Sequence, residues 1–351
     1  MRRLVLLLGL LLGFSALWIH FEEIPLLVIG QPTKTGKIQA SMEEPFFKKL
    51  RTTSQIPFAI TYKPIDLAGY KDTFQLKMLK DGIADLISLR FPQNSIIEPS
   101  LIGIDLVGMI GDYGTAKLVA GAYYGTIDKY LQKNFDAKLL GVWTFGPQEI
   151  FCNQPISKLA SLKGLRVRAS STSQTTFISE LGGKPTILPF EDTRNALRDG
   201  LVDCAITSGA SANFAGWPQF AKYNYPAQIQ FGLNGYVISL AKWNRLSASQ
   251  QFRVQRAFDQ YLRQLWQFTE ILQLDMAQCN SGSNCKFGTQ YKGSRIQLDP
   301  GDQPLIQEIF KSKILPGWKV DCDKVHVGCS HTWEAKVSPI LAQSGEQAIQ
   351  K

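Results

Sequence analysis

Two segments of this 351-residue chain share one local pattern, and this pattern restricts the fold more than any other sequence feature. Each segment contains the end of an amphipathic helix, an Asp-Gly turn, a short apolar stretch with an aspartate, and a strand that ends in polar residues. The two segments are MLKDGIADLISLR, residues 78–90, and ALRDGLVDCAITS, residues 196–208. Because no fixed repeat period joins them, they indicate two lobes of similar construction rather than a repeat protein.

Strand-like and helix-like stretches alternate along most of the chain. Helices are expected at 43–54, at 70–82 with Gly82 as the C-cap, at 117–135, through Phe177 and Leu181, and at 192–200. Such alternation predicts an α/β fold with mostly parallel sheets. The expected strands lie within residues 26–32, 58–66, 83–91, 101–111, 137–146, 148–156, 165–170, 185–190 and 201–209.

A long helix is expected after Ser247, which is a suitable N-cap residue. Apolar residues recur at helical spacing from Val254 to Leu272. A helix over residues 248–277 is roughly 45 Å long at 1.5 Å per residue. Since this length exceeds one lobe, we expect the helix to brace both lobes from behind.

The N-terminus has the pattern of an export signal. Arg2 and Arg3 precede an apolar run over residues 4–19, and two acidic residues follow it. We expect a signal peptide at residues 1–25. Because FSALW is a poor match to the small-x-small cleavage pattern, an uncleaved membrane anchor remains the alternative.

The cysteines fit an exported protein. Cys279 and Cys285 lie in CNSGSNC, and Cys322 and Cys329 lie in CDKVHVGC, so each pair is expected to close a small disulfide loop. Zinc sites prefer closer C-x-x-C spacing, and we expect no metal. The remaining cysteines, Cys152 and Cys204, can pair with each other only if their strands are neighbours.

Charge and catalytic residues favour binding over catalysis. The net charge of +9 suits anionic partners, but the cations are scattered singly, which argues against nucleic acid. None of the three histidines follows a core strand beside a nucleophile, and no glycine-rich phosphate or dinucleotide loop is present. We expect no enzyme activity and no cofactor. A carboxylate-based hydrolase or lyase is the alternative, with Asp72, Asp85, Glu191 and Asp203 available.

From about residue 30 to 324 the chain resembles solute-binding proteins of the tripartite ATP-independent periplasmic (TRAP) transporters. The most specific matches are NQPISKLASLKGLRVRAS and LGGKPTILPFEDTRNALRDGLVDCAITS. The resemblance implies two α/β lobes of the type II-like periplasmic-binding-protein fold, linked by crossover strands and a long helix. Lobe I is then expected at 26–147 plus about 232–265, lobe II at 148–231 plus about 266–340, and a C-terminal tail at 341–351.

The resemblance also implies binding residues. Arg168 falls on the family arginine that forms a salt bridge with the substrate carboxylate, whereas Arg166 alternates to the opposite, solvated strand face. Phe190 matches an aromatic wall of the pocket, with simple core packing as its alternative. Asp72 falls near a polar pocket position, or else is solvated on its helix.

Three departures from the family pattern alter the expected pocket. Gln148 stands where many members have a second arginine, and Thr207 stands where an asparagine is usual. Arg90 replaces an acidic or polar residue, and it is expected either to act as a second cation or to pair with a carboxylate of its own lobe. Asn213 and Trp217 are further candidates at the rim or in the pocket, with core packing as the alternative for Trp217.

We therefore expect a monomeric periplasmic protein that captures a small organic acid and delivers it to a TRAP permease. Two arginines from opposite lobes would suit a dicarboxylate or a keto acid. The alternatives are a binding protein of an ABC importer and a membrane-anchored sensor.

Overall fold

The computed structural model describes residues 23–349, and their side chains up to residue 344. The expected signal at 1–25 lies outside this range, apart from its last residues, which enter the first strand. Within residues 23–349, no helix has both the length and the apolar character needed to span a membrane.

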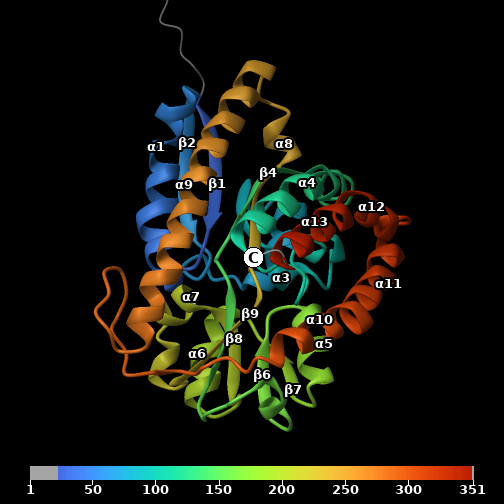
Figure 1. Ribbon diagram of the computed structural model, residues 1–351. Helices are drawn as coiled ribbons and strands as arrows, with labels where there is room; N and C mark the ends of the chain where they lie inside the picture. The colour runs from blue at the N-terminus through green and yellow to red at the C-terminus, as the bar shows by residue number, and fades with distance from the viewer. Residues whose placement is uncertain (1–22, 350–351) are drawn as a thin grey trace, which may run out of the picture.

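Two separate sheets form the centres of two lobes (Figure 1). The strands of the first sheet are β1 Ile24–Gly30, β2 Phe58–Pro64, β3 Leu86–Arg90, β4 Ala137–Thr144 and β10 Leu233–Ser239, in the order β2-β1-β3-β10-β4. The strands of the second sheet are β5 Gln148–Cys152, β6 Arg166–Ala169, β7 Lys184–Ile187, β8 Cys204–Ser208, β9 Tyr223–Gln230 and β11 Ser294–Arg295, in the order β11-β9-β5-β8-β6-β7.

Crossover strands make both sheets mixed rather than mostly parallel. The chain passes from β4 directly into β5 of the other sheet, and it returns from β9 into β10. β10 runs antiparallel to β3 and β4, and β5 runs antiparallel to β8 and β9, because each crossover strand enters its sheet from the other lobe. The remaining pairs of described strands are parallel, as the helix–strand alternation predicts.

Helices cover the faces of the two sheets. Those before the long helix are α1 Glu44–Ser54, α2 Gln75–Lys80, α3 Phe91–Asn94, α4 Tyr113–Phe135, α5 Thr172–Glu180, α6 Phe190–Arg198, α7 Gly209–Phe214 and α8 Leu240–Trp243. The long helix and those that follow are α9 Ala248–Asn280, α10 Asp302–Ile309, α11 Leu315–Val325, α12 Cys329–Lys336 and α13 Ser338–Ile349. The expected C-terminal tail at 341–351 is therefore helical as far as residue 349.

The long helix α9 spans both lobes, as expected (Figure 1). The Ser247 side chain accepts a hydrogen bond from the Gln250 backbone N–H, and the Gln250 side chain accepts one from the Ser247 backbone N–H. Its N-terminal half packs on α1 and β4 of the first lobe, and its C-terminal end packs on α7 and β11 of the second lobe.

The C-terminal helices differ from the expected division of the chain. Helix α10 packs against β9 of the second lobe, but α11, α12 and α13 pack against the first lobe, although the family resemblance places residues up to 340 in lobe II. Indole N–H groups fix this placement, since Trp318 donates to the carbonyl of Pro99 and Trp333 donates to the carbonyl of Gly103. The helices after α9 thus form a second connection between the lobes, on the opposite side from α9 in Figure 1.

Residues 101–111 form the end of a short 3-10 helix, Pro99–Ile102, and a loop that is buried as far as residue 110, rather than the strand that their apolar run predicts. The Asp105 carboxylate accepts hydrogen bonds from the backbone N–H groups of Phe231 and Leu233, each at 2.8 Å, on the crossover between β9 and β10. Burial raises the pKa of Asp105 to about 7, against the effect of these backbone donors. The apolar residues of this segment are buried in the core, which accounts for the strand-like pattern.

Three disulfides join the six cysteines in the expected pairs. Cys152 and Cys204 lie directly opposite each other in the register of β5 and β8. Their strands are therefore neighbours, as this pairing requires.

Candidate functional site

A closely lined cavity lies where strand ends from the two lobes meet. Its volume is about 20 Å³, which is room for about one water molecule. The carboxyl ends of parallel strands lie at the same edge of a sheet. The end of β3 in the first sheet and the ends of β6 and β8 in the second sheet therefore meet at the cavity. The cavity is lined by Arg90, Pro92, Gln93, Phe145, Gln148, Arg168, Ser170, Phe190, Thr207, Ser211, Gly232 and Asn234.

Arg168, on β6, is 1% exposed, and backbone carbonyls hold its guanidinium. Its Nε donates to the carbonyl of Leu188 at 3.1 Å, and its Nη1 donates to the carbonyl of Ile206 at 2.9 Å. Its Nη2 is buried in the cavity wall without a partner. A buried donor left unpaired costs free energy, so this nitrogen is poised for an acceptor that enters the cavity.

Burial lowers the pKa of Arg168 to about 10. The charge of Asp72 raises it in opposition, and the charge of Arg90 lowers it further. At neutral pH the guanidinium is still cationic. It is therefore a desolvated positive charge, and such a charge attracts an anion more strongly than one in water does.

Arg90, at the end of β3, faces the same cavity from the first lobe. Its Nε donates to Gln31 Oε1 at 2.9 Å, and its Nη1 lies 3.4 Å from Asp72 Oδ2. The rings of Phe145 and Phe190 lie 5.0 and 4.7 Å from its guanidinium carbon, within the range of a cation–π contact. Like Arg168, it keeps one nitrogen, Nη2, without a partner.

Gln31 orients Arg90, and the sequence interpretation missed it. Its side-chain N–H donates to Ser88 Oγ at 2.9 Å, and its backbone N–H donates to the buried carboxylate of Glu43 at 2.6 Å. These bonds turn the amide oxygen toward Arg90. The available signal was its position directly after the first strand, in LLVIGQP.

Five of the predicted binding residues line the cavity, namely Arg90, Gln148, Arg168, Phe190 and Thr207. Further lining residues that the sequence interpretation did not identify are Pro92, Gln93, Phe145, Ser170, Ser211, Gly232 and Asn234.

Asp72 lies behind this wall and is fully buried, so it is not solvated on its helix. It pairs with Arg90 and accepts a hydrogen bond from the backbone N–H of Phe190 at 3.3 Å, while its Oδ1 has no partner. Arg90 thus both faces the cavity and pairs with a carboxylate of its own lobe, so the two alternatives hold together.

Asn213 and Trp217 lie outside the cavity wall. The Asn213 amide donates to Asn280 Oδ1 at 2.8 Å and to the carbonyl of Thr289 at 2.7 Å, which fastens α7 to the end of α9. Trp217 is fully buried and packs on Phe190, with 5.5 Å between ring centroids. Its ring centroid also lies 5.8 Å from the guanidinium carbon of Arg168, so Trp217 supports the cavity wall from beneath.

Two of the carboxylates considered for acid–base catalysis have structural partners. Asp203 pairs with the exposed Arg166 at 2.5 Å, so Arg166 lies away from the cavity as strand alternation predicts. Asp85 accepts a hydrogen bond from the backbone N–H of Leu27 at 2.8 Å. Neither carboxylate lines the cavity.

Direct contacts join the two lobes beside the cavity at the start of α6. Lys71 Nζ lies 2.6 Å from Asp192 Oδ1, and Lys34 Nζ donates to the carbonyl of Glu191 at 3.3 Å. With the Phe190–Asp72 bond, these contacts hold the lobes together over the small cavity. The exposed Lys71–Asp192 ion pair is worth only about 0–1 kcal/mol, so it does little to oppose separation of the lobes.

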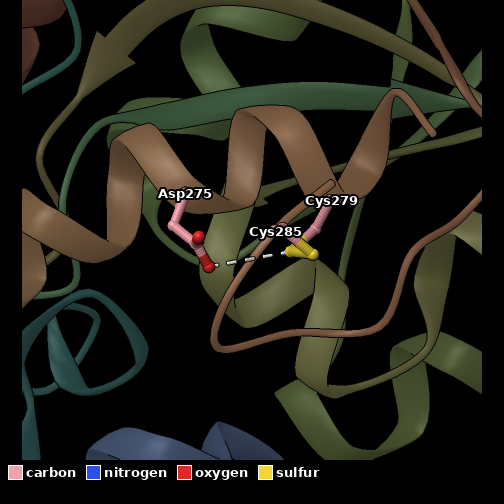
Figure 2. A group of neighbouring side chains, drawn as sticks. All are labelled: Asp275, Cys279 and Cys285. Carbon is pink, nitrogen blue, oxygen red and sulfur yellow. Dashed lines mark hydrogen bonds between the residues drawn. A yellow bond between two sulfur atoms is a disulfide. The ribbon is translucent and has the colours of Figure 1, made fainter. Parts of the chain in front are cut away.

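One group outside the cavity has metal-ligand residue types. Figure 2 shows Asp275, Cys279 and Cys285 near the end of α9, where the two sulfurs form a disulfide and not free thiolates. The Asp275 carboxylate accepts hydrogen bonds from the backbone N–H groups of Lys286 at 2.7 Å and Phe287 at 2.9 Å. The group therefore fastens the loop after α9 and does not fit a metal site.

Residues 44–311 match the model of the bacterial extracellular solute-binding protein family 7, DctP. The chain belongs to this family. Its members are receptors for solutes, and the cavity between the lobes of this member is its candidate solute site.

Solved structures share the fold of this family 7 member. A solute receptor of Bordetella pertussis that binds pyroglutamic acid has a TM-score of 0.78 at 17% identity, covering 90% of this chain and 99% of its own. A TRAP periplasmic protein of Desulfovibrio salexigens with bound orotic acid has a TM-score of 0.79 at 15% identity, with coverage of 90% and 99%. One of Roseobacter denitrificans with bound β-D-glucuronate has a TM-score of 0.77 at 15% identity, with coverage of 89% and 100%. At these identities the likeness establishes the two-lobed fold.

Proposed function

We propose that this protein is the periplasmic receptor of a TRAP transporter, that it captures a small organic acid between its lobes, and that it delivers the acid to the membrane permease. The observation that carries the proposal is the pair of immobilised arginines, Arg90 and Arg168, each with one buried Nη2 that lacks a partner. The acids named for the three structural relatives support a carboxylate as the ligand group.

The acid enters when the lobes separate, because the cavity of about 20 Å³ has no room for it. Its carboxylate then bridges the two lobes, with one oxygen for each Nη2. Binding stabilises the closed state by no more than the difference in affinity between the closed and open states. The crossovers between β4 and β5 and between β9 and β10 act as the hinge, and α9 acts as the brace.

A thermal-shift screen of organic acids on the mature protein tests this function. A ligand at 100 times its Kd stabilises the folded state by about 2.7 kcal/mol, so the true ligand raises the unfolding temperature clearly. If no carboxylic acid in a broad panel raises this temperature or gives a calorimetric signal, the proposal is wrong. A neighbouring pair of membrane permease genes would support delivery to a TRAP permease over an ABC importer or a sensor.

A further inference from the structure

The two arginines of the cavity do not offer two free positive charges. Arg90 pairs with Asp72, and both side chains are buried, at 3% and 0% exposure. A carboxylate that far from water requires a cation beside it, so the charge of Arg90 is committed to Asp72. Arg168 has only neutral partners, the carbonyls of Leu188 and Ile206, so its charge remains available.

Glu191 is another buried carboxyl group near the two arginines. It is 8% exposed, and neither carboxyl oxygen accepts a hydrogen bond from another side chain or backbone group. Burial raises the pKa of Glu191, and the nearby charge of Asp72 raises it further, whereas the charge of Arg90 lowers it. A buried carboxyl group without donors favours the neutral acid. With Glu191 neutral, Arg90, Arg168 and Asp72 leave one positive charge beside the cavity.

The rest of the cavity wall is uncharged. Its other polar side chains are amides and hydroxyls, namely Gln93, Gln148, Ser170, Thr207, Ser211 and Asn234. Such groups can pair with a lactam, amide or hydroxyl of a ligand. A second carboxylate would enter this desolvated space without a free cation, and the charge of Asp72 behind the wall would oppose it.

We propose that Asp72 determines the specificity of the site, by restricting it to acids with a single carboxylate whose other polar groups are neutral. This inference rests on the proposed function, and it replaces the dicarboxylate that two cations alone would suggest. Asp72 acts by neutralising Arg90, so that the cavity accepts one negative charge.

Matched ligand pairs isolate the charge from the size of the ligand. Succinate and its half-amide succinamate have nearly the same shape, as do glutarate and glutaramate, but each half-amide has one carboxylate. Calorimetry at pH 8 should give tighter binding of at least one half-amide than of its diacid, by at least about tenfold. A diacid that binds as tightly as its half-amide would overturn the inference.

The pH dependence of the same pairs is a second test on the unaltered protein. If only the monoanion of a diacid binds, its affinity should rise by up to about tenfold for each pH unit from 8 toward 6, as the second carboxyl group takes up a proton. The half-amide serves as the control for titration of the protein itself, and its affinity should stay nearly constant. Equal pH dependence within a pair would overturn the inference.

Two variants assign the effect to Asp72. Asp72→Asn frees the charge of Arg90, so the diacid should bind at least as tightly as the half-amide. Glu191→Gln is the matched control, and it should keep the wild-type preference within about twofold, because it replaces a buried carboxyl group that accepts no hydrogen bond and favours its neutral form. An unchanged preference in folded Asp72→Asn, or a reversal in Glu191→Gln, would overturn the assignment.

The proposed function fails separately from this inference. If acids such as pyroglutamate or orotate bind but the diacids bind equally well, only the charge restriction is wrong. If no organic acid of either class binds, the receptor function is wrong and the inference falls with it.

Discussion

Arg168 is the residue on which the account of binding depends most. Arg168→Ala should weaken binding of the identified acid by roughly 30-fold to several thousand-fold, since removing one partner of a buried charge pair costs about 2–5 kcal/mol. Arg168→Lys should lie between this variant and the wild type, because an ammonium cannot reproduce the fixed fork of a guanidinium. Calorimetry measures the affinity of each variant, provided that circular dichroism shows the variant to be folded.

Arg166→Ala is the matched control for these variants. Arg166 lies two residues away on the same strand, but it is exposed and pairs with Asp203. It should change the affinity by less than about threefold, as expected of an exposed ion pair. If Arg166→Ala proves damaging, or Arg168→Ala binds as well as the wild type, the assignment of the carboxylate-binding arginine is wrong.

The depressed pKa of Arg168 predicts a pH limit for binding. Because its pKa lies at about 10, the guanidinium is charged from pH 7 to 9 and loses its proton as the pH rises further. Affinity for the acid should therefore be constant up to pH 9 and fall above pH 10, by up to about tenfold per pH unit. Calorimetry on wild type and Arg168→Ala measures this, and an equal fall in both would attribute it to other groups.

Sequence reasoning identified part of this site. Arg168 was predicted from one family-like stretch, and Phe190 and Thr207 were predicted from the next one, and all three line the cavity. The pair of Arg90 with Asp72, and the support from Gln31, join segments far apart in the chain. No local pattern encodes such contacts, so the sequence could only leave the partner of Arg90 open.

At the scale of elements, the disulfide between Cys152 and Cys204 joins the neighbouring strands β5 and β8. Its cysteines are 52 residues apart, and loop-closure entropy gives such a bond about 4 kcal/mol. The double variant Cys152→Ala/Cys204→Ala should lower the free energy of unfolding by about that amount, as measured with urea.

The bond between Cys279 and Cys285 provides the comparison, because its cysteines are only 6 residues apart. The same relation gives about 2 kcal/mol, so its double variant should destabilise the protein less. Mass spectrometry of the mature protein should find no free thiol. An undiminished free energy of unfolding without the first bond would contradict this ranking.

Periodicity predicted most regular elements up to residue 209 and the long helix, but it missed β9, β10 and the helices after α9, and it failed where tertiary contacts decide the conformation. Helix α9 begins at the predicted cap, since the Ser247 capping box is encoded locally. Residues 101–111 look like a buried strand by composition, but Asp105 ties them to the β9–β10 crossover. Burial alone explains their apolar character, and periodicity cannot distinguish a buried loop from a buried strand.

At the scale of the whole molecule, lobe closure should be visible in solution. Small-angle scattering should give a smaller radius of gyration when the identified acid is added. Arg168→Ala should show no such change at the same acid concentration, provided that this concentration lies well below its weakened Kd. An unchanged radius for the wild type at saturation would indicate a preformed site in place of hinge closure.

A crystal structure of the protein with the acid from the thermal-shift screen tests the central claim most directly. The account predicts one carboxylate between the lobes, with one oxygen about 3 Å from Arg168 Nη2 and the other about 3 Å from Arg90 Nη2. A carboxylate that contacts neither arginine, or an acid bound outside the cavity, would contradict it.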